Sequence, residues 1–508
     1  MKPSDPSDSP VSPRRDRILF LLLLLLALVL RVAALSGREL WYDELQSMTF
    51  SRLSIGDMLQ SVIVFDPHPP LYYLQLHFWI LVSSSETWAK LNSVFWSVLA
   101  VAGLYILCRR LVNARFAFYA GLVFAVLPIG IWYGQEVRMY SMLMALAIGS
   151  FYFAHEYLNF RRGAVESLGV FGFTAAFLYT HGSGFMLLIS LVAYAALAWA
   201  KDRKIDRKIF FRFLLLLGIP ASLYVLWMVK GLFFSMEQLQ RPGLPEVIDS
   251  LAALVLGLLT YPVWLRWLAV VLVLTVVAYI ILRDREWNMR SIAISFFLLP
   301  IAVCLLLSYL IKPMWHYRTL LYTVPFLCML IAWILFRFSA WLAGRGMRAA
   351  WIRHGAVGLL AVLLAGASLA QQQGFSYTWD MRGAAQYLQA NTHRGDIVYI
   401  IHPRVFWGID WYWLGPGNGF NPLGLEYFQT APNGAYLLYP VDTEDVDPGA
   451  TYWIVYRDVD SLDPISPDRL ESVVAFDHLF NVKTHAQKHL RHGRVFHQAA
   501  FDFERPHV

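Results

Sequence analysis

Charged residues are scarce in this sequence of 508 residues. Asp, Glu, Lys and Arg together make up 15% of the chain, whereas a soluble domain carries about 25%. Hydrophobic residues make up 58%, and the mean hydropathy is +0.49. So little charge cannot cover a water-facing surface, which excludes a soluble enzyme and a disordered scaffold. Most of the chain must face lipid or other membrane helices.

Cysteine is also scarce. The three cysteines, Cys108, Cys304 and Cys328, lie in apolar stretches, so they are interpreted as small core residues. This excludes a secreted domain built on disulfides. The net charge of +7 raises the question of nucleic-acid binding, but in a membrane protein an excess of Lys and Arg usually sets orientation.

Long apolar runs are abundant. A membrane span needs about 20 mostly apolar residues, and the sequence predicts eleven, uncertain by several residues at each end. These are 18–35, 88–108, 116–132, 138–158, 166–179, 184–200, 211–230, 263–282, 291–311, 317–336 and 355–371. Residues 248–262 could form a further broken or re-entrant helix, so about 11–13 transmembrane helices are expected.

The N-terminal residues 1–17 are rich in Pro, Ser and Arg and are predicted to be a disordered cytoplasmic tail. The end of the first span, Val32-Ala33-Ala34, resembles a signal-peptide cleavage site. We favour an uncleaved anchor, because the segment is long and ten further spans depend on its topology.

The loop charges predict an orientation. With the N-terminus in the cytoplasm, clusters such as Arg109–Arg110 and Arg161–Arg162 lie inside, and the outer loops hold few Lys or Arg. This is the pattern of the positive-inside rule, so much of the basic excess is a topology signal and no nucleic-acid partner is expected. Eleven crossings place residues 372–508 outside the membrane.

The C-terminal region has a different composition, with ten Lys and Arg against sixteen Asp and Glu. Residues 396–401 and 452–456 are predicted to be buried strands, and 381–390 has helical spacing. The fold class is therefore mainly α and polytopic, with a transmembrane domain at 18–371 and a small extracytoplasmic α/β domain at 372–508. The aromatic stretch 407–428 could stack on carbohydrate or form an interface belt, and we favour the belt.

The first outer loop, about 36–87, is too apolar for a solvated loop. Its apolar stretches predict amphipathic or re-entrant helices. Asp43 and Glu44 would then lie at the membrane boundary beside aromatic residues, where a partly desolvated carboxylate can act as a general base. Asp43 could equally cap the helix that follows it, and the two roles are compatible.

Further polar residues are predicted at the outer ends of spans. Gln135, Glu136 and Arg138 lie in the turn between the third and fourth spans, at a depth where unpaired charge is costly. Arg138 could form a structural ion pair with Glu136, or its planar guanidinium could bind a phosphate.

His181 lies at the outer end of the fifth span, where it could orient a substrate hydroxyl or serve only as a satisfied helix-end residue. Lys312, His316 and Arg318 form a cationic group before the tenth span, suited to an anionic lipid headgroup or to interface snorkelling. Together these helix ends predict an outer cavity that holds a lipid phosphate while its isoprenoid tail stays in the bilayer.

Three motifs carry a resemblance to a known family. Residues 40–44 (Leu-Trp-Tyr-Asp-Glu) resemble the acidic first-loop motif of the C-type glycosyltransferases. Residues 68–73 and 133–140 are similar to motifs of the branch that contains the dolichyl-phosphate-mannose protein mannosyltransferases and the bacterial aminoarabinose transferases. The resemblance covers about 18–340, and the C-terminal region looks like the small periplasmic domain of the bacterial relatives.

The resemblance implies an integral-membrane glycosyltransferase of the bacterial inner membrane. It would move a sugar from a polyprenyl-phosphate donor to a glycan, lipid or protein acceptor on the periplasmic face, usually with inversion. It implies Asp43 as the base or as the carboxylate that positions the acceptor, with Glu44 beside it, and it implies cations that bind the donor phosphate. Those cations are Arg138, Lys312, His316 and Arg318, with His68, Tyr133, Gln135, Glu136 and His181 lining or orienting the site.

No cofactor is certain from the sequence; a divalent metal is possible, and Asp43 and Glu44 are the candidate residues for it. Two other functions compete with the transferase. A flippase or transporter of lipid-linked sugars would use similar cations but would distribute polar residues towards both leaflets. A non-catalytic anchoring protein would leave Asp43, Glu136 and Arg318 without a role in a costly location.

Overall fold

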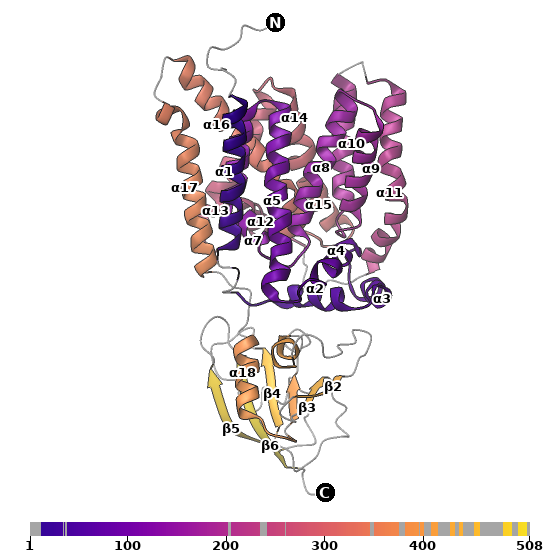
Figure 1. The fold of residues 1–508 in the computed structure, drawn as a ribbon, viewed down its shortest axis with the longest axis vertical. Coiled ribbons are helices and arrows are strands. Elements are labelled where there is room, and N and C mark those ends of the chain that lie inside the picture. Colours follow the sequence, from indigo (N-terminus) through magenta and orange to yellow (C-terminus); the bar gives the residue numbers. More distant parts are fainter. Residues whose placement is uncertain are drawn as a thin grey trace. The chain divides into compact units, whose positions relative to one another are not determined.

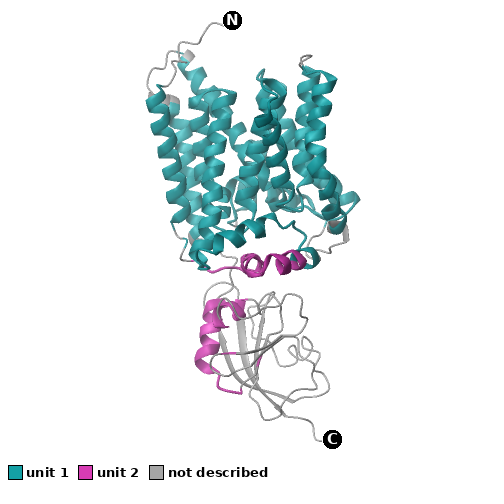
Figure 2. Cartoon of the chain, turned by 45° about the vertical axis from the view of Figure 1, so that its right-hand side comes forward, with its two compact units in different colours: residues 1–35, 62–375 teal, residues 36–61, 376–508 magenta. Residues whose placement is uncertain are grey.

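The structure is a computed structural model, and it divides the chain into two compact units (Figure 2). One unit comprises residues 1–35 and 62–375, and the other comprises residues 36–61 and 376–508. The residues described are 12–33, 35, 38–201, 205–233, 241–259, 261–345, 350–374, 381–395, 397–400, 408–414, 427–431, 436–439, 452–457, 481–489 and 496–504.

The first unit is helical, and many of its helices run side by side (Figure 1). Its helices up to residue 201 are α1 (Pro13–Val32), α4 (Leu71–Ile80), α5 (Glu86–Leu111), α6 (Ala114–Val126), α7 (Pro128–Tyr133), α8 (Tyr140–Asn159), α9 (Ala164–Leu178) and α10 (Phe185–Lys201). Those that follow are α11 (Arg207–Phe233), α12 (Leu244–Leu256), α13 (Val263–Leu282), α14 (Trp287–Ile292), the π-helix η2 (Ala293–Leu298), α15 (Leu299–Leu310), the 3-10 helix η3 (Tyr317–Thr323), α16 (Val324–Gly344) and α17 (Ala350–Gly374).

Six helical segments of the described residues are long and apolar enough to cross a membrane. They are Glu86–Leu111, Arg207–Lys230, Val263–Leu282, Trp287–Leu310, Tyr317–Ala343 and His354–Gln372. Each coincides with a predicted span, so the mainly α, polytopic fold is confirmed. The other five predicted spans are also helical, in α1, α6 with α7, α8, α9 and α10, but these helices lack the required length or apolar composition. The total of about eleven spans stays a prediction.

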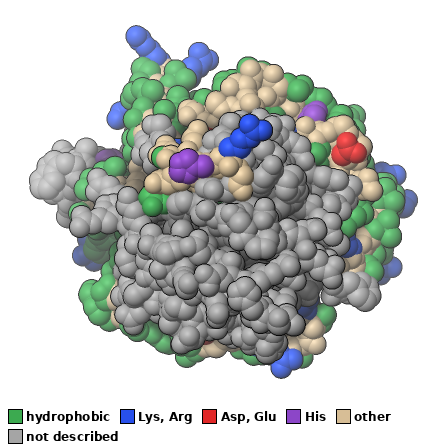
Figure 3. All heavy atoms as spheres, turned by 90° about the horizontal axis from the view of Figure 1, so that it is seen from below, with side chains coloured by type: hydrophobic (Ala, Val, Ile, Leu, Met, Phe, Trp, Pro, Cys, Tyr) green, Lys and Arg blue, Asp and Glu red, His purple; other side chains and the backbone are tan. Residues whose placement is uncertain are grey.

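The helices of the first unit pack against one another and expose apolar side chains on their outer faces. α8 packs against α5 and α9, and α6 packs against α1, α5 and α16. Leu22, Leu226 and Leu363 are exposed on the outside of their helices, which suits contact with lipid tails. The space-filling view in Figure 3 likewise shows hydrophobic side chains around the rim of the described surface.

The predicted disorder of residues 1–17 is wrong for its last part. α1 begins at Pro13, whose fixed backbone angle suits the first helical turn, and the Ser12 hydroxyl accepts a hydrogen bond from the Arg15 N–H at 3.4 Å. Residues 1–11 lie outside the described residues.

α12 is the short helix in the region where a broken helix was foreseen. It ends at Gly257, whose φ of +85° is accessible to glycine without strain. A Cβ atom there would lie 1.9 Å from Gln371 Oε1, which accepts the Leu258 N–H at 2.7 Å. The close approach of glycine backbone and glutamine amide therefore ties the end of α12 to α17.

The second unit contains a six-stranded sheet in the order β2-β3-β1-β4-β6-β5. β1 runs parallel to β3 and β4, and the other neighbouring pairs are antiparallel. The strands are β1 (Ile397–Ile400), β2 (Tyr427–Thr430), β3 (Tyr436–Tyr439), β4 (Tyr452–Arg457), β5 (Asn481–His489) and β6 (Phe496–Glu504). The predicted strands at 396–401 and 452–456 correspond to β1 and β4.

Besides the sheet, this unit contains the helical elements α18 (Met381–Asn391), η4 (Asp410–Leu414) and α2 (Tyr42–Arg52) and the first part of α3 (Ile55–Phe65). α18 buries Ala384, Ala385 and Leu388 and packs against the π-helix η4. α2 belongs to the first outer loop, as does α3, which continues into the first unit. The three short helices α2, α3 and α4 match the predicted apolar stretches of this loop. Of the aromatic stretch 407–428, most residues lie outside the described ones.

The two compact units do not follow the order of the chain, and the predicted division into 18–371 and 372–508 stays a prediction. Residues 36–61 belong to the same compact unit as residues 376–508. The reason lies in contacts that composition does not reveal: the Glu39 carboxylate and the Leu40 backbone bond to residues beyond 380.

Asp410 makes the stability of this second unit depend on pH. Its side chain is 9% exposed, and burial raises its pKa to about 7, against about 3.9 in an unfolded chain. The folded state holds the proton more tightly, so the stability contribution is complete below about pH 4 and is lost as pH rises through about 7. We expect hydrogen-exchange protection factors of residues 408–414 to fall between pH 5.5 and pH 8.

The matching variant is Asp410→Asn, which keeps the shape of the side chain and removes its titration. Its protection factors should show no such fall over the same pH range. A fall of equal size in wild type and Asp410→Asn would contradict the assignment to this carboxyl group.

Candidate active site

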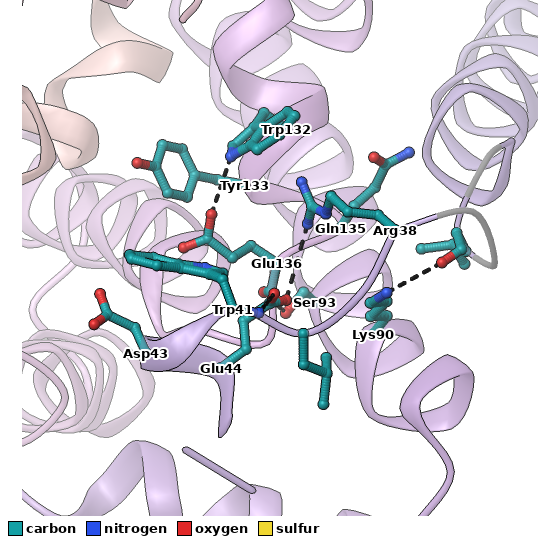
Figure 4. Close-up of polar contacts among 12 residues, drawn as sticks. Arg38, Trp41, Asp43, Glu44, Lys90, Ser93, Trp132, Tyr133, Gln135 and Glu136 are labelled. Carbon is teal, nitrogen blue, oxygen red and sulfur yellow. Dashed lines mark hydrogen bonds and ion pairs between the residues drawn. The ribbon is translucent and has the colours of Figure 1, made fainter. Parts of the chain in front are cut away.

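The turn between α7 and α8 lies within the motif at 133–140, and its polar side chains are buried. Trp132 Nε1 donates to Glu136 Oε2 at 3.0 Å, and the Ser93 hydroxyl donates to the Glu136 carbonyl oxygen (Figure 4). Gln135 Nε2 donates to the carbonyl oxygens of Arg31 and Ala33 at 2.9 and 3.0 Å. Gln135 and Glu136 therefore hold the turn against α5 and the end of α1.

Arg138 lies in the same turn and is 4% exposed. Its Nη1 donates to the Tyr73 hydroxyl at 3.4 Å, and that hydroxyl donates to Asp66 Oδ2 at 2.8 Å. Asp66 Oδ1 accepts the His68 N–H at 2.6 Å. A buried chain of hydrogen bonds thus runs from Arg138 through Tyr73 to Asp66, and the proposed pair of Arg138 with Glu136 stays a prediction.

Asp66 was not among the predicted site residues, nor were Tyr73 and Lys230. Lys230 Nζ donates to the carbonyl oxygens of Val62, at 2.8 Å, and of Asp66. Burial raises the pKa of Asp66, and the charges of Arg138 and Lys230 oppose that rise. The available signal was an acid next to Pro-His-Pro-Pro in an apolar loop.

His68 and His181 lie against each other, with ring centroids 4.3 Å apart and an angle of 32° between the planes. The Gly182 N–H donates to His68 Nδ1 at 3.2 Å, and the Ser183 N–H donates to His181 Nδ1 at 3.0 Å. Because Nδ1 accepts in both rings, the proton of each neutral imidazole lies on Nε2. A Cβ at Gly182 would be 2.9 Å from the Pro67 carbonyl oxygen, so glycine permits this approach.

The electrostatic surroundings of His68 are positive. Burial lowers its pKa well below the ordinary value, and three positive charges lower it further. These charges belong to Arg138, Lys230 and Arg318. The structure therefore brings together two predicted phosphate ligands, one lysine that was not predicted, and two neutral histidines.

The group at 312–318 is only partly cationic. His316 Nδ1 accepts the Arg318 N–H at 3.2 Å and so caps η3. Burial, with the neighbouring charge of Arg318, lowers the pKa of His316 to about 3. At that pKa His316 adds no positive charge to the group at physiological pH, and its place as a phosphate ligand stays a prediction. The place of Lys312 as a phosphate ligand stays a prediction.

Tyr133 is fully buried and links two parts of the first unit. Its hydroxyl donates to the Tyr317 hydroxyl at 3.4 Å, which joins α7 to the start of η3. This contact brings the 132–140 turn to the segment that carries Arg318, although the two are about 180 residues apart in the chain.

Asp43 and Glu44 lie in the first turn of α2, in the second unit. Glu44 is fully buried, its Oε2 accepts the Trp41 N–H at 3.1 Å, and Arg38 Nη2 lies 3.8 Å from its Oε1 (Figure 4). The residue at the N-cap position is Trp41. The prediction that Asp43 caps the helix is therefore wrong, because the carboxylate that serves the helix start belongs to Glu44.

No group of three or more His, Cys, Asp and Glu side chains is placed to hold a metal ion within the residues that the structure describes. The two carboxylates of Asp43 and Glu44 do not make such a group, and Glu44 is engaged at the helix start. A divalent metal at these residues stays a prediction.

The fold is similar to that of ArnT from Cupriavidus metallidurans. The crystal structure of ArnT in the apo state aligns with a TM-score of 0.59 and 14% identity, covering 94% of this chain and 97% of that protein. The structure of the same protein bound to undecaprenyl phosphate aligns with a TM-score of 0.57 and 13% identity, with the same coverage.

No protein-family model matches the sequence, and no curated protein matches it. The likeness to ArnT is therefore one of structure, and it extends over nearly the whole length of both chains. This chain has the same fold as ArnT, which agrees with the fold that the motifs of this chain predicted.

Proposed function

We propose that this protein is a membrane glycosyltransferase that takes its sugar from a polyprenyl-phosphate donor. The observation that carries the proposal is the convergence of Arg138, Lys230 and Arg318 on the surroundings of His68 in the helical unit. Asp66 is the carboxylate that faces the charges of Arg138 and Lys230. An excess of positive charge on one buried and two half-buried side chains is costly by itself and is suited to an anionic ligand, and the similar protein ArnT has a structure with undecaprenyl phosphate bound.

The phosphate is the group that these cations would hold. A guanidinium can bind two phosphate oxygens at once, whereas a lysine acts as a point charge. In the transfer step the bond between the anomeric carbon and the phosphate oxygen breaks, and the electron pair leaves with the phosphate. Arg138, Arg318 and Lys230 would stabilise that developing charge, which is how most of the barrier is lowered. The leaving oxygen needs no separate acid.

Asp43 is the proposed base. The acceptor hydroxyl attacks the anomeric carbon from the side opposite the phosphate, and its proton passes to the Asp43 carboxylate. A single displacement of this kind inverts the configuration and needs one base, unlike the paired carboxylates of retaining hydrolases. Glu44 has a different role in this proposal, because its carboxylate is committed to the start of α2.

The loop charges support an orientation for this chemistry. With the N-terminus in the cytoplasm of a bacterial inner membrane, the clusters Arg109–Arg110 and Arg161–Arg162 lie inside. The site and residues 372–508 would then face the periplasm, where the acceptor is a glycan, a lipid or a protein.

The proposal is tested with purified protein and a panel of radiolabelled polyprenyl-phosphate sugars, incubated with membrane-extract acceptors. We expect label to leave the carrier and appear in a new glycosidic product. This should happen only when the protein and a donor that it recognises are both present. Binding of donors without transfer to any acceptor would contradict the proposal. A liposome assay would then show whether the protein moves the carrier across the bilayer, as a flippase does.

A further inference from the structure

The start of α18 receives a carboxylate from a residue 342 positions earlier in the chain. Glu39 Oε2 accepts the N–H of Met381 at 3.1 Å and the N–H of Arg382 at 3.3 Å. These N–H groups belong to the first two residues of α18, where no carbonyl of the same helix can accept them. The negative charge of Glu39 is also favourable at the positive end of the helix dipole.

Residues 38–52, which we call the α2 segment, are held at both ends. At the start, the Leu40 N–H donates to the Tyr412 hydroxyl at 2.9 Å. At the end, the Arg52 guanidinium lies over the Trp411 ring, 4.3 Å from its centroid. Tyr412 and Trp411 both belong to η4, which packs against α18.

Two contacts so far apart along one short helix restrain its rotation as well as its position. Glu39 precedes α2 and Arg52 is its last residue, and between them the helix carries Asp43 in its first turn. A single contact would leave the helix free to turn about that point. The pair of contacts fixes the direction in which each side chain of the first turn leaves the helix axis.

We propose that α18 and η4 position the α2 segment, and that Glu39 is a positioning residue for Asp43. This inference rests on the proposed function, since it assigns to residues 376–508 the placing of the base. A catalytic carboxylate displaced by about 1 Å can lose about 100-fold in rate. Residues 376–508 would then contribute to the transfer reaction by holding the helix that carries the base.

The test compares Glu39→Ala, Glu39→Gln and Glu166→Ala in the full-length protein. Glu166→Ala is the matched control, because Glu166 Oε2 accepts the Gly163 N–H at 3.1 Å at the start of α9. We expect Glu39→Ala to lower kcat about 10- to 100-fold, with the donor KM changed by less than about twofold. Amide exchange of residues 40–52 should become faster. Glu39→Gln should recover most of kcat, because its amide oxygen still accepts both N–H groups, and Glu166→Ala should leave kcat and the exchange of 40–52 unchanged.

Tyr412→Phe removes the acceptor of the Leu40 N–H and provides a second variant if Glu39→Ala does not fold. It should also speed exchange in the α2 segment and lower kcat. Unchanged exchange of residues 40–52 in both variants would overturn the inference, and so would faster exchange with an unchanged kcat. An equal loss of kcat in Glu166→Ala would overturn it too. The exchange measurement needs no substrate, so it tests the contact even if wild type transfers no sugar.

Discussion

Asp43→Asn is expected to lower the rate of sugar transfer by about 100- to 10,000-fold, the usual range for loss of a general base. The amide has the shape of the carboxylate but cannot accept the proton of the acceptor hydroxyl. Donor binding should be unchanged, because the proposed phosphate ligands are other residues. The measurement is label transfer from the carrier under single-turnover conditions, with donor binding determined separately.

Asp57→Asn is the control for this substitution. Asp57 is an exposed residue of the same outer loop, whose carboxylate accepts the Ser54 hydroxyl at 2.6 Å. It makes the same chemical change near α2 without touching the proposed base, so transfer should continue at the wild-type rate. Turnover by Asp43→Asn at the rate of Asp57→Asn would remove Asp43 from the role of base.

Arg138→Ala is expected to weaken donor binding by about 10- to 100-fold, since a hydrogen bond to a charged group contributes about 1.5–3 kcal/mol. The substitution also removes a charge that opposes the raised pKa of Asp66, so Asp66 should take up a proton more readily. Arg138→Lys should recover part of the affinity, because it restores the charge without the planar guanidinium. The measurement is the dissociation constant of the polyprenyl-phosphate sugar.

Arg283→Ala is the control for loss of a cation, because Arg283 is exposed at the end of α13. Its donor affinity should equal that of wild type. Arg318→Ala should resemble Arg138→Ala, since both charges act on His68. If donor affinity is unchanged in both Arg138→Ala and Arg318→Ala, the phosphate assignment is wrong.

The helical architecture could be predicted because its cause is local. Apolar runs of the right length predict spans wherever they occur, and the loop arginines predict their direction without knowledge of partners. Short helices in the first outer loop could be foreseen for the same reason, since its apolar stretches are too short to cross the membrane.

The composition of the site was harder to predict because its contacts join distant parts of the chain. Asp66 gains its importance from Lys230, 164 residues later, and from Arg138 through Tyr73. No spacing rule connects these positions. His316 illustrates the same difficulty: beside Arg318 it suggests a cation, but burial and the charge of Arg318 lower its pKa to about 3.

The prediction that Asp43 caps α2 was wrong because it placed the start of the helix at the wrong residue. Both acids follow Trp41 closely, and Asp is the more usual cap. The structure starts α2 at Tyr42, which places Glu44 at the third helical position, where a longer side chain can reach back to the Trp41 N–H. The helix starts two residues earlier than a cap at Asp43 would require, and this decides which acid serves the helix start and which is assigned to chemistry.

The bond between Glu39 and the start of α18 has a consequence for how the protein is made. Residue 39 leaves the ribosome early, and its partners at 381 and 382 follow only after the whole helical unit has been synthesised. The α2 segment therefore cannot reach its final contacts while the spans are being inserted. The α2 segment is thus synthesised early but forms its final contacts late. A protein cut short before residue 381 would carry Asp43 yet lack the contacts that hold its helix.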